Sequence, residues 1–311
     1  MAAARKSKRK SPGLLIEIPG FLRYLRDDRG LSANTVAAYG NDLKQFAKFL
    51  DERGFDSWNA DRSAISEFLN FLAGREYEPS SQARKLAAVK SMYRFLVSEG
   101  KAAADPTQGL GGARVTKKRP TVISVGDVDR LLAAAASTRT PEGYRDSAML
   151  ELLYATGMRV SELVALDVDD VQFDAGIVMC GRGGGRQRHL PFGARAGHAV
   201  LGYVRGARRK LLKSPDEPAL FLNHRGRRLT RQGFWLIIKG HAAAAMIETP
   251  TTPHTLRHSF ATHRLRGDTS IPEVQSLLGH ASPATTQVYL ELAREKGAID
   301  ALPGSATSGP K

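Results

Sequence analysis

Four of the eight histidines lie between residues 254 and 280, in the segments PHTLRHSFATHRL and LLGH. His254 and Arg257 are three residues apart in a segment with helical character, so we expect both side chains on one face of a helix. A guanidinium donates paired hydrogen bonds to phosphate oxygens, and a nearby imidazole can transfer a proton. His258 and His263 are expected on other sides of the same helix. This spacing therefore favours a phosphate-binding site.

Zinc is the alternative ligand for these histidines, because His254 and His258 are four residues apart. A zinc-binding HExxH helix carries a glutamate directly after its first histidine, whereas Thr, Leu and Arg separate this pair. A cation one residue from a ligand also repels a metal ion. The sequence therefore disfavours zinc, and we expect no metal site.

Another arginine stands at an unusual position in the segment LLYATGMRVSELVAL. The helix through Leu153 is expected to end at Gly157, which favours a left-handed cap, and Ser161 is expected to begin the next helix. Arg159 falls in the short corner between the two helices, where a side chain can project into a cleft. An isolated loop arginine would usually be solvated, so Arg159 becomes informative only together with other residues.

The segment CGRGGGRQRHLP, residues 180–191, predicts the turn of a β-hairpin between apolar strands at residues 177–179 and 190–192. Glycines allow the backbone to approach a surface closely, and arginine forks fit phosphate oxygens. A solvated surface turn is the alternative, and the Gly-Lys-Ser/Thr ending of a nucleotide-binding Walker loop is missing. The candidate DNA-binding side chains of this hairpin are Arg182, Arg186 and Arg188.

Composition favours a polyanionic partner. The 311 residues include 46 Lys and Arg against 31 Asp and Glu, for a formal net charge of +15. Nucleic acid is the first candidate, because the rival interpretation of an anionic membrane surface lacks a long basic amphipathic helix. No apolar run is long enough to span a membrane, and the single Cys180 fits a reducing compartment, so we expect a cytoplasmic protein. The basic residues 1–13 are expected to form a frayed arm.

The first hundred residues predict helices joined by short turns. Ser32 is expected to cap a helix, Asp61 or Ser63 opens another, and Pro79 begins a third. The outer face of this third helix carries charges of one sign, because no acidic residue occurs between Ser80 and Ser98. We therefore expect this face to contact DNA through Arg84, Lys85, Lys90 and Arg94.

A linker at residues 112–121 is expected to separate two domains, because the segment KAAADPTQGLGGARVTKKRP is rich in Gly, Pro, Lys and Arg and breaks every periodic pattern. Beyond it, Ser124 and Asp127 are placed to form a capping box. The hairpin gives the one clear strand signal of the second domain. Helices are predicted near residues 230–239, 253–264, 271–278 and 283–291. The fold class is therefore mainly α with a small antiparallel β-sheet, followed by a flexible tail at residues 304–311.

Three segments together, TGMRVSEL, HTLRHSFATH and LLGHASPATTQVY, resemble in order and spacing the signature of the tyrosine site-specific recombinases of the phage integrase family. The bacterial XerC/XerD type is the most similar. The resemblance covers nearly the whole chain, with residues 14–111 corresponding to a helical core-binding, SAM-like domain and residues 122–303 to the catalytic domain. It implies a two-domain, C-shaped clamp around DNA.

The resemblance also implies a role for each motif residue. Arg159 and Arg257 match the pair that clamps the scissile phosphate, a role suited to bidentate forks. His254 matches a hydrogen-bonding or acid-base partner, and His280 matches a histidine that stabilises the transition state. Tyr289 matches the nucleophile, which would form a 3′-phosphotyrosyl link. This chemistry conserves the energy of the broken bond, so no metal, ATP or other cofactor is expected.

The hairpin departs from the family pattern. The family carries in this loop a lysine that protonates the departing 5′ oxygen, but no lysine occurs here between Lys118 and Lys210. Arg182 takes the lysine position, and its guanidinium is a poor proton donor because its pKa stays above about 12. Arg186 is the alternative, since the loop is a residue longer than usual. A DNA-binding relative with little or no strand exchange is therefore the competing interpretation.

The expected partner is a double-stranded DNA recombination site. By resemblance, four protomers, identical or shared with a related recombinase, act on two sites through a Holliday junction. The implied role is the resolution of chromosome dimers at cell division, for which a DNA translocase of the division machinery is a candidate partner. Integration of a phage or mobile element is the alternative within the family. A metal-dependent nuclease is disfavoured, because no carboxylate cluster of the required kind is present.

Overall fold

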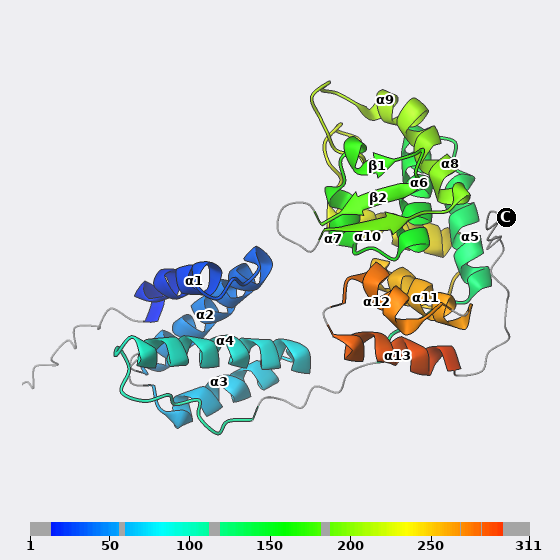
Figure 1. The fold of residues 1–311 in the computed structure, drawn as a ribbon. Coiled ribbons are helices and arrows are strands. Elements are labelled where there is room, and N and C mark those ends of the chain that lie inside the picture. The colour runs from blue at the N-terminus through cyan, green and yellow to red at the C-terminus, as the bar shows by residue number, and fades with distance from the viewer. Residues whose placement is uncertain are drawn as a thin grey trace, which may run out of the picture. The chain divides into compact units, whose positions relative to one another are not determined.

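The computed structural model describes residues 14–55, 60–111, 119–181, 187–267, 269–280 and 282–294. The chain divides into two compact units between residues 117 and 118. Helices dominate both units, and a three-stranded antiparallel sheet lies in the second (Figure 1). The predicted fold class, mainly α with a small antiparallel sheet, is confirmed.

The first unit contains a short 3-10 turn and four helices: η1 (Leu14–Ile16), α1 (Ile18–Asp27), α2 (Ala33–Arg53), α3 (Arg62–Gly74) and α4 (Pro79–Ser98). The predicted caps of α2 and α3 are confirmed, because Ser32 accepts from the Thr35 amide and Asp61 from the Ala64 amide. A side-chain oxygen at this position satisfies one of the amides that a helix leaves unpaired at its start. Aromatic rings then fill the core between these helices, including Phe46, Phe68 and Tyr93.

The predicted DNA-facing surface of α4 is wrong for Lys85. This side chain is 9% exposed, and its ammonium donates to Asp42 at 2.8 Å and to Gln45 at 2.6 Å. A buried acid must be paired, and Asp42 on α2 recruits both Lys85 and Arg84. Lys90 is half-buried and donates to the Leu110 carbonyl, whereas Arg94 is exposed. The cations of Lys85 and Arg84 therefore connect α4 to α2 within this unit.

The second unit is built around helix α6, ten of whose sixteen residues are buried. Its elements are α5 (Val125–Ala136), α6 (Pro141–Thr156), α7 (Val160–Ala165), η2 (Val168–Asp170), β1 (Val171–Gln172), β2 (Ile177–Cys180), β3 (Arg188–Pro191), α8 (Ala194–Gly202), the π-helical turn η3 (Tyr203–Ala207), α9 (Arg208–Leu211), α10 (Arg231–Ala244), α11 (Pro253–Arg266), α12 (Ile271–Leu278) and α13 (Pro283–Arg294). The predicted capping box of Ser124 and Asp127 begins α5.

The hairpin predicted from the glycine-rich segment is confirmed by β2 and β3. Val178 of β2 pairs with Leu190 of β3 on one side and with Val171 of β1 on the other. The strand β1 was not predicted, because two residues are too short to show an alternating pattern. The hairpin arginines Arg182 and Arg186 lie outside the described residues.

Helix α11 packs against α6, α12 and α13. Nine of the fourteen residues of α11 are buried, so this helix lies inside the unit and lacks a wide polar face. Phe260 and Ala261 of α11 form an apolar cluster with Val274 and Leu278 of α12 and with Tyr289 of α13. This cluster fixes α13 beside α11.

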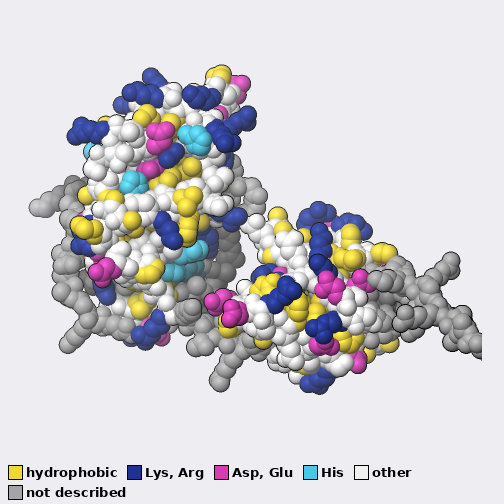
Figure 2. Space-filling model, turned by 180° about the vertical axis from the view of Figure 1, so that it is seen from behind, with side chains coloured by type: hydrophobic (Ala, Val, Ile, Leu, Met, Phe, Trp, Pro, Cys, Tyr) yellow, Lys and Arg dark blue, Asp and Glu magenta, His cyan; other side chains and the backbone are white. Residues whose placement is uncertain are grey.

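Basic side chains concentrate at one end of the second unit (Figure 2). Figure 2 shows Lys and Arg gathered at the end that carries α9, where Arg205, Arg209 and Lys210 are exposed. Such a surface attracts polyanions. Within the described part of the chain, no helix is both long and apolar enough to cross a membrane.

Candidate active site

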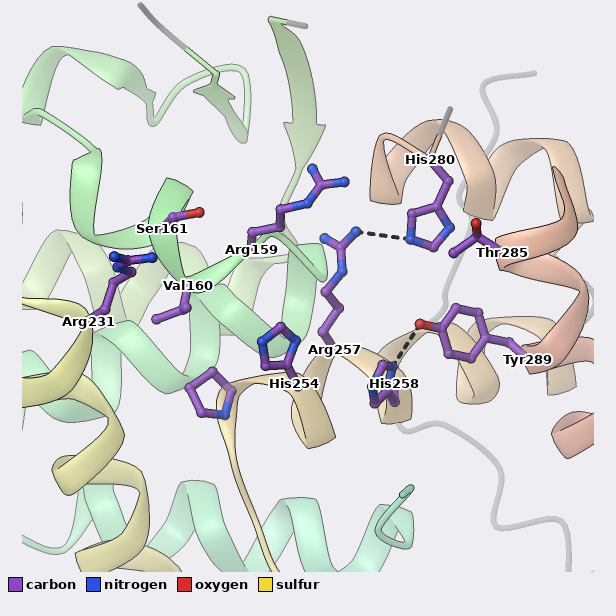
Figure 3. A pocket seen from close by; sticks show the side chains of 11 residues that line it. Arg159, Val160, Ser161, Arg231, His254, Arg257, His258, His280, Thr285 and Tyr289 are labelled. Atoms are coloured by element: carbon purple, nitrogen blue, oxygen red, sulfur yellow. Dashed lines mark hydrogen bonds between the residues drawn. The ribbon is translucent and has the colours of Figure 1, made fainter. Parts of the chain in front are cut away.

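A cleft of about 430 Å³ opens in the second unit between the start of α7, the start of α10, α11, the end of α12 and α13. It brings together the five residues selected from the sequence motifs, which are Arg159, His254, Arg257, His280 and Tyr289 (Figure 3). The cleft also contains Arg231 and His258, which were not selected. Residues more than a hundred positions apart therefore meet in one polar cavity.

Arg257 lies at the floor of this cleft and is 5% exposed. Its Nη1 donates to the Gly157 carbonyl at 2.5 Å, and its Nη2 donates to the Leu278 carbonyl at 2.6 Å and contacts His280 Nε2 at 3.2 Å. Burial and the nearby Arg159 charge lower the pKa of Arg257 to about 10. The side chain therefore stays cationic at neutral pH and is held in a fixed orientation.

Gly157 must be glycine for two reasons. Its φ of +61° lies in the left-handed region, and a Cβ atom there would meet the Phe260 ring at 2.2 Å. The predicted left-handed cap of α6 is thus confirmed, and it directs the Gly157 carbonyl toward Arg257. The following helix begins at Val160, one residue earlier than predicted, because Glu162 accepts from the Arg159 amide at 2.7 Å and closes the first turn.

Arg159 projects from this corner into the cleft, and its side chain is 41% exposed. Its Nη2 donates to the Gly279 carbonyl at 3.0 Å, and its Nη1 donates to Glu162 at 3.1 Å. Arg257 donates to the preceding carbonyl, that of Leu278. The unpaired carbonyls at the end of α12 therefore orient both guanidinium groups, as expected for cations at the negative end of a helix dipole.

Arg188 does not extend from the hairpin as a free DNA-binding side chain, so that prediction is corrected. Its Nη1 and Nη2 donate to the two carboxylate oxygens of Glu162 at 2.7 and 2.8 Å, and its Nε donates to the Leu277 carbonyl. These bonds lower the pKa of Glu162 despite its burial. The carboxylate is thus ionised and bridges Arg159 and Arg188. Removing one partner would leave a charge that is partly shielded from water without its counterion, which destabilises the protein.

His280 follows the left-handed Gly279 and faces Arg257. An arginine can only donate, so Nε2 of His280 accepts from Arg257 and Nδ1 carries the ring proton. Nδ1 is 3.0 Å from the hydroxyl oxygen of the fully buried Thr286 and donates to it. Burial and the Arg257 charge lower the pKa of His280 to about 4, so the ring is neutral at pH 7. Thr286 thereby fixes both the tautomer and the orientation.

Tyr289 reaches the cleft from α13 and is 4% exposed. Its Oη atom is 2.7 Å from Nδ1 of His258, and its ring lies between those of His258 and His280, with centroids 5.4 and 6.2 Å away. The expectation that His258 points away from the site is therefore wrong. Burial raises the pKa of the phenol, so Tyr289 is protonated at neutral pH.

His254 is an exposed residue at the start of α11, and its ring centroid is 6.3 Å from that of His258. Arg231, at the start of α10, lies on the same side of the cleft as His254 (Figure 3). Both are available to a ligand that enters from solvent. The cleft therefore offers an oriented pair of guanidinium groups, several imidazoles and one phenol, which suits phosphoryl transfer to an oxygen nucleophile.

Three features of this site were missed or misplaced from the sequence. His258 was wrongly assigned to another face, because a separation of four residues places it on the same face of α11 as His254. Glu162 stands three residues after Arg159, the position of the acidic residue in a capping box, but this pattern was missed because arginine is not a usual first residue of that motif. Arg231 follows the cap residue Thr230, and nothing in its spacing links it to the other motifs. Among the described residues, no group of three His, Cys, Asp or Glu is arranged to hold a metal ion.

Comparison with known proteins finds relatives that match about nine tenths of the chain. The model of the phage integrase family matches residues 122–296, and that of the phage integrase N-terminal SAM-like domain matches residues 18–100. The chain is 47% identical over 281 residues to tyrosine recombinase XerC of Herpetosiphon aurantiacus, covering 90% of this chain and 92% of the relative. It is 41% identical over 280 residues to tyrosine recombinase XerD of Listeria monocytogenes, covering 89% and 94%.

Solved structures show the same fold. The crystal structure of XerH site-specific recombinase bound to a palindromic difH substrate, a post-cleavage complex, matches with a TM-score of 0.71 at 20% identity. The match covers 93% of this chain and 95% of that chain. A dimer of lambda integrase residues 75–356 bound to a core site matches with a TM-score of 0.69 at 17% identity.

Proposed function

We propose that this chain, which belongs to the phage integrase family, is a site-specific tyrosine recombinase that cuts and rejoins DNA through a 3′-phosphotyrosyl intermediate. The observation that carries the proposal is the meeting of Arg159, Arg257 and Tyr289 in one cleft. In this proposal the two arginines hold the non-bridging oxygens of the scissile phosphate. Tyr289 Oη attacks the phosphorus, and the 5′ oxygen leaves.

The arrangement of the cleft supports these roles on physical grounds. Phosphoryl transfer depends mainly on positioning and on stabilising charge, and fixed guanidinium groups do both. Arg257 and Arg159 are already oriented by carbonyls of Gly157, Leu278 and Gly279, so little reorganisation is needed when the phosphate arrives. His280 helps to hold the Arg257 guanidinium in place through Nε2, and the exposed His254 is placed to contact a phosphate oxygen from the solvent side.

The relatives favour chromosome dimer resolution as the biological role, since they are named XerC and XerD. We propose that the protein acts in the cytoplasm as part of a tetramer on two DNA sites, with a related recombinase as partner. The assignment of residues 14–111 and 122–303 as the DNA-binding and catalytic domains stays a prediction, as does the clamp around DNA. The predicted DNA contacts that stay untested are those of Arg84, Lys90, Arg94, Arg182 and Arg186.

The proposal is tested with a nicked suicide substrate, on which the cleaved strand loses a short fragment and rejoining is prevented. Wild type is expected to give a covalent protein–DNA adduct on a denaturing gel, and Tyr289→Phe none. Tyr154→Phe is the matched control, because this half-buried tyrosine also contacts a histidine of α11, yet lies outside the cleft. Arg159→Ala and Arg257→Ala are expected to lose cleavage far more than DNA affinity.

No adduct with wild type on a site that it binds would refute the proposal. That result would favour the competing interpretation, a DNA-binding relative without strand exchange, for which Arg182 in place of the usual lysine is the sequence indication. Equal losses of affinity and cleavage in Arg159→Ala or Arg257→Ala would instead refute the clamp roles while leaving the recombinase function intact.

A further inference from the structure

His258 lies in the cleft, yet neither the sequence motifs nor the proposed roles assign it any chemistry. It stands one helical turn after His254 on α11, and its Nδ1 is 2.7 Å from Tyr289 Oη. Figure 3 shows the phenol of Tyr289 pointing at this imidazole from the opposite wall. The two rings are tilted by 39°, with the hydroxyl toward the edge of the imidazole that carries Nδ1.

We propose that His258 is the catalytic base that takes the hydroxyl proton of Tyr289 as Oη attacks the scissile phosphate, an inference that rests on the proposed role of Tyr289 as nucleophile. The geometry meets the requirement that a base lie within hydrogen-bond reach of the proton it removes. The Nδ1 atom accepts this proton from the phenol when the ring hydrogen of the neutral imidazole is on Nε2.

The surroundings keep His258 ready to accept. Burial, followed by the charges of His254 and Arg257, lowers the pKa of His258 to about 4, so the ring is neutral at physiological pH. The groups that face it from the surrounding elements are the Tyr289 phenol on α13, His280 after α12, His254 and Arg257 on α11, Arg159 before α7 and Arg231 on α10. None of these is an acid. The Glu162 carboxylate outside the cleft offsets part of the positive charge through its pairs with Arg159 and Arg188, and a bound phosphate offsets more of it.

Binding of the DNA phosphate is expected to raise the basicity of His258. A phosphodiester bound by Arg159 and Arg257 offsets the positive charge that opposes protonation of His258, and its own negative charge favours the imidazolium. The ring therefore becomes a stronger base only when the substrate is in place. This couples loss of the Tyr289 proton to DNA binding and keeps the nucleophile protonated in the free protein.

The bonds and protons balance in both directions. In cleavage, the proton moves from Tyr289 Oη to His258 Nδ1, the Oη–phosphorus bond forms, and the bond from phosphorus to the 5′ oxygen breaks. The 5′ oxygen leaves with the bonding electrons and takes a proton from water or from a cationic side chain. In rejoining, a 5′ hydroxyl attacks the phosphotyrosine, and the His258 imidazolium returns its proton to the departing phenolate.

The contacts select His258 over His254 for this role. His254 is exposed, and its ring centroid is 6.3 Å from that of His258, on the far side from Tyr289 in Figure 3. His280 is also close to Tyr289, but its Nε2 and Nδ1 are engaged by Arg257 and Thr286. The acceptor nearest the phenol proton is therefore Nδ1 of His258.

The test compares single-turnover adduct formation on the suicide substrate between pH 6 and 9. His258→Asn retains an oxygen that can accept a hydrogen bond in place of Nδ1 but cannot hold a proton. We expect it to bind DNA normally, to form adduct about 10²–10⁴-fold more slowly at pH 7, and to gain about tenfold per pH unit as the phenol ionises without help. Wild type is expected to change little over the same range.

His263→Asn is the matched control. His263 is another buried histidine of α11 whose Nδ1 contacts a tyrosine hydroxyl, that of Tyr154 at 2.9 Å, and whose pKa burial lowers to about 4. It lies outside the cleft, so we expect the pH profile of the wild type. A second variant, His258→Ala, is expected to recover activity in proportion to added free-base imidazole.

Two outcomes would overturn the inference while the wild type still forms adduct. One is a His258→Asn rate within about threefold of wild type with the same pH profile. The other is a loss that neither rises with pH nor responds to imidazole in His258→Ala, which would indicate a structural role only. Absence of adduct in the wild type itself would instead refute the proposed recombinase function on which the inference rests.

Discussion

Thr286→Val isolates the contact that orients His280. The substitution keeps the shape of the side chain and removes the hydroxyl that accepts from His280 Nδ1 at 3.0 Å. Thr286 is fully buried, so no bulk water replaces the lost acceptor. The ring can then rotate and present either nitrogen to Arg257, and the fixed tautomer of the free protein is lost.

The expected size follows from the loss of a single hydrogen bond. Such a bond contributes about 0.5–1.5 kcal/mol net, and a donor left unsatisfied can cost more. We therefore expect the free energy of unfolding to fall by about 1 kcal/mol. If the same energy is lost in orienting His280 for the transition state, adduct formation slows about fivefold, since about 1.4 kcal/mol corresponds to a factor of ten.

Thr262→Val provides the control for this measurement. Thr262 is also fully buried, but its hydroxyl has no hydrogen-bond partner within the described part of the chain. Its replacement is expected to be neutral or slightly stabilising and to leave the cleavage rate unchanged. Urea unfolding and suicide-substrate kinetics measure the two effects. Equal behaviour of the two variants, or a full wild-type rate for Thr286→Val, would refute the orienting role of Thr286.

Three further predictions follow from individual residues. Gly157→Ala is expected to lower the free energy of unfolding by at least about 2 kcal/mol in urea, because the new Cβ would overlap the Phe260 ring. Gly30→Ala is the control: its φ of +60° is similar but the space around it is open, so the loss should be only about 1 kcal/mol. Burial lowers the pKa of His263 to about 4, so as the pH falls the unfolded chain takes up the proton before the folded protein does. The stabilisation from a neutral His263 is therefore fully present above about pH 6.5, and below it the free energy of unfolding should fall by about 1 kcal/mol per pH unit. His263→Asn should show a shallower slope. Arg182→Lys is expected to speed cleavage by restoring a better proton donor, and a substrate with a 5′ sulfur leaving group should erase that gain.

Local patterns predicted the elements well where one physical rule dominated. Ser32, Asp61 and Ser124 cap helices as expected, because a side-chain oxygen before an apolar periodic run has few other roles. Gly157 ends α6 in the left-handed conformation for the same local reason. The motif residues Arg159 and Arg257 were found through family resemblance, and the structure places both in one cleft.

Tertiary pairing accounts for the errors. Lys85 looks like an exposed cation within α4, but Asp42 on another helix draws it inside. Arg188 looks like part of a basic loop, but the half-buried Glu162 on α7 turns it inward. For both residues the partner is distant in sequence, and helical or strand periodicity carries no information about it. His258 is a different case: its spacing of four residues from His254 places both on one face, and only its contact with Tyr289 of α13 depends on tertiary packing.

The most direct test of the central claim is to identify the tyrosine that becomes linked to DNA. The adduct from the suicide substrate is digested with nuclease and trypsin and analysed by mass spectrometry. Tyr289 is the one tyrosine of the tryptic peptide that spans residues 267–294, whereas the chain contains eight in all. We predict a nucleotide linked by a phosphodiester bond to this peptide alone. A nucleotide on another tyrosine, or a stable adduct in Tyr289→Phe, would contradict the assignment of the cleft as the site of DNA cleavage.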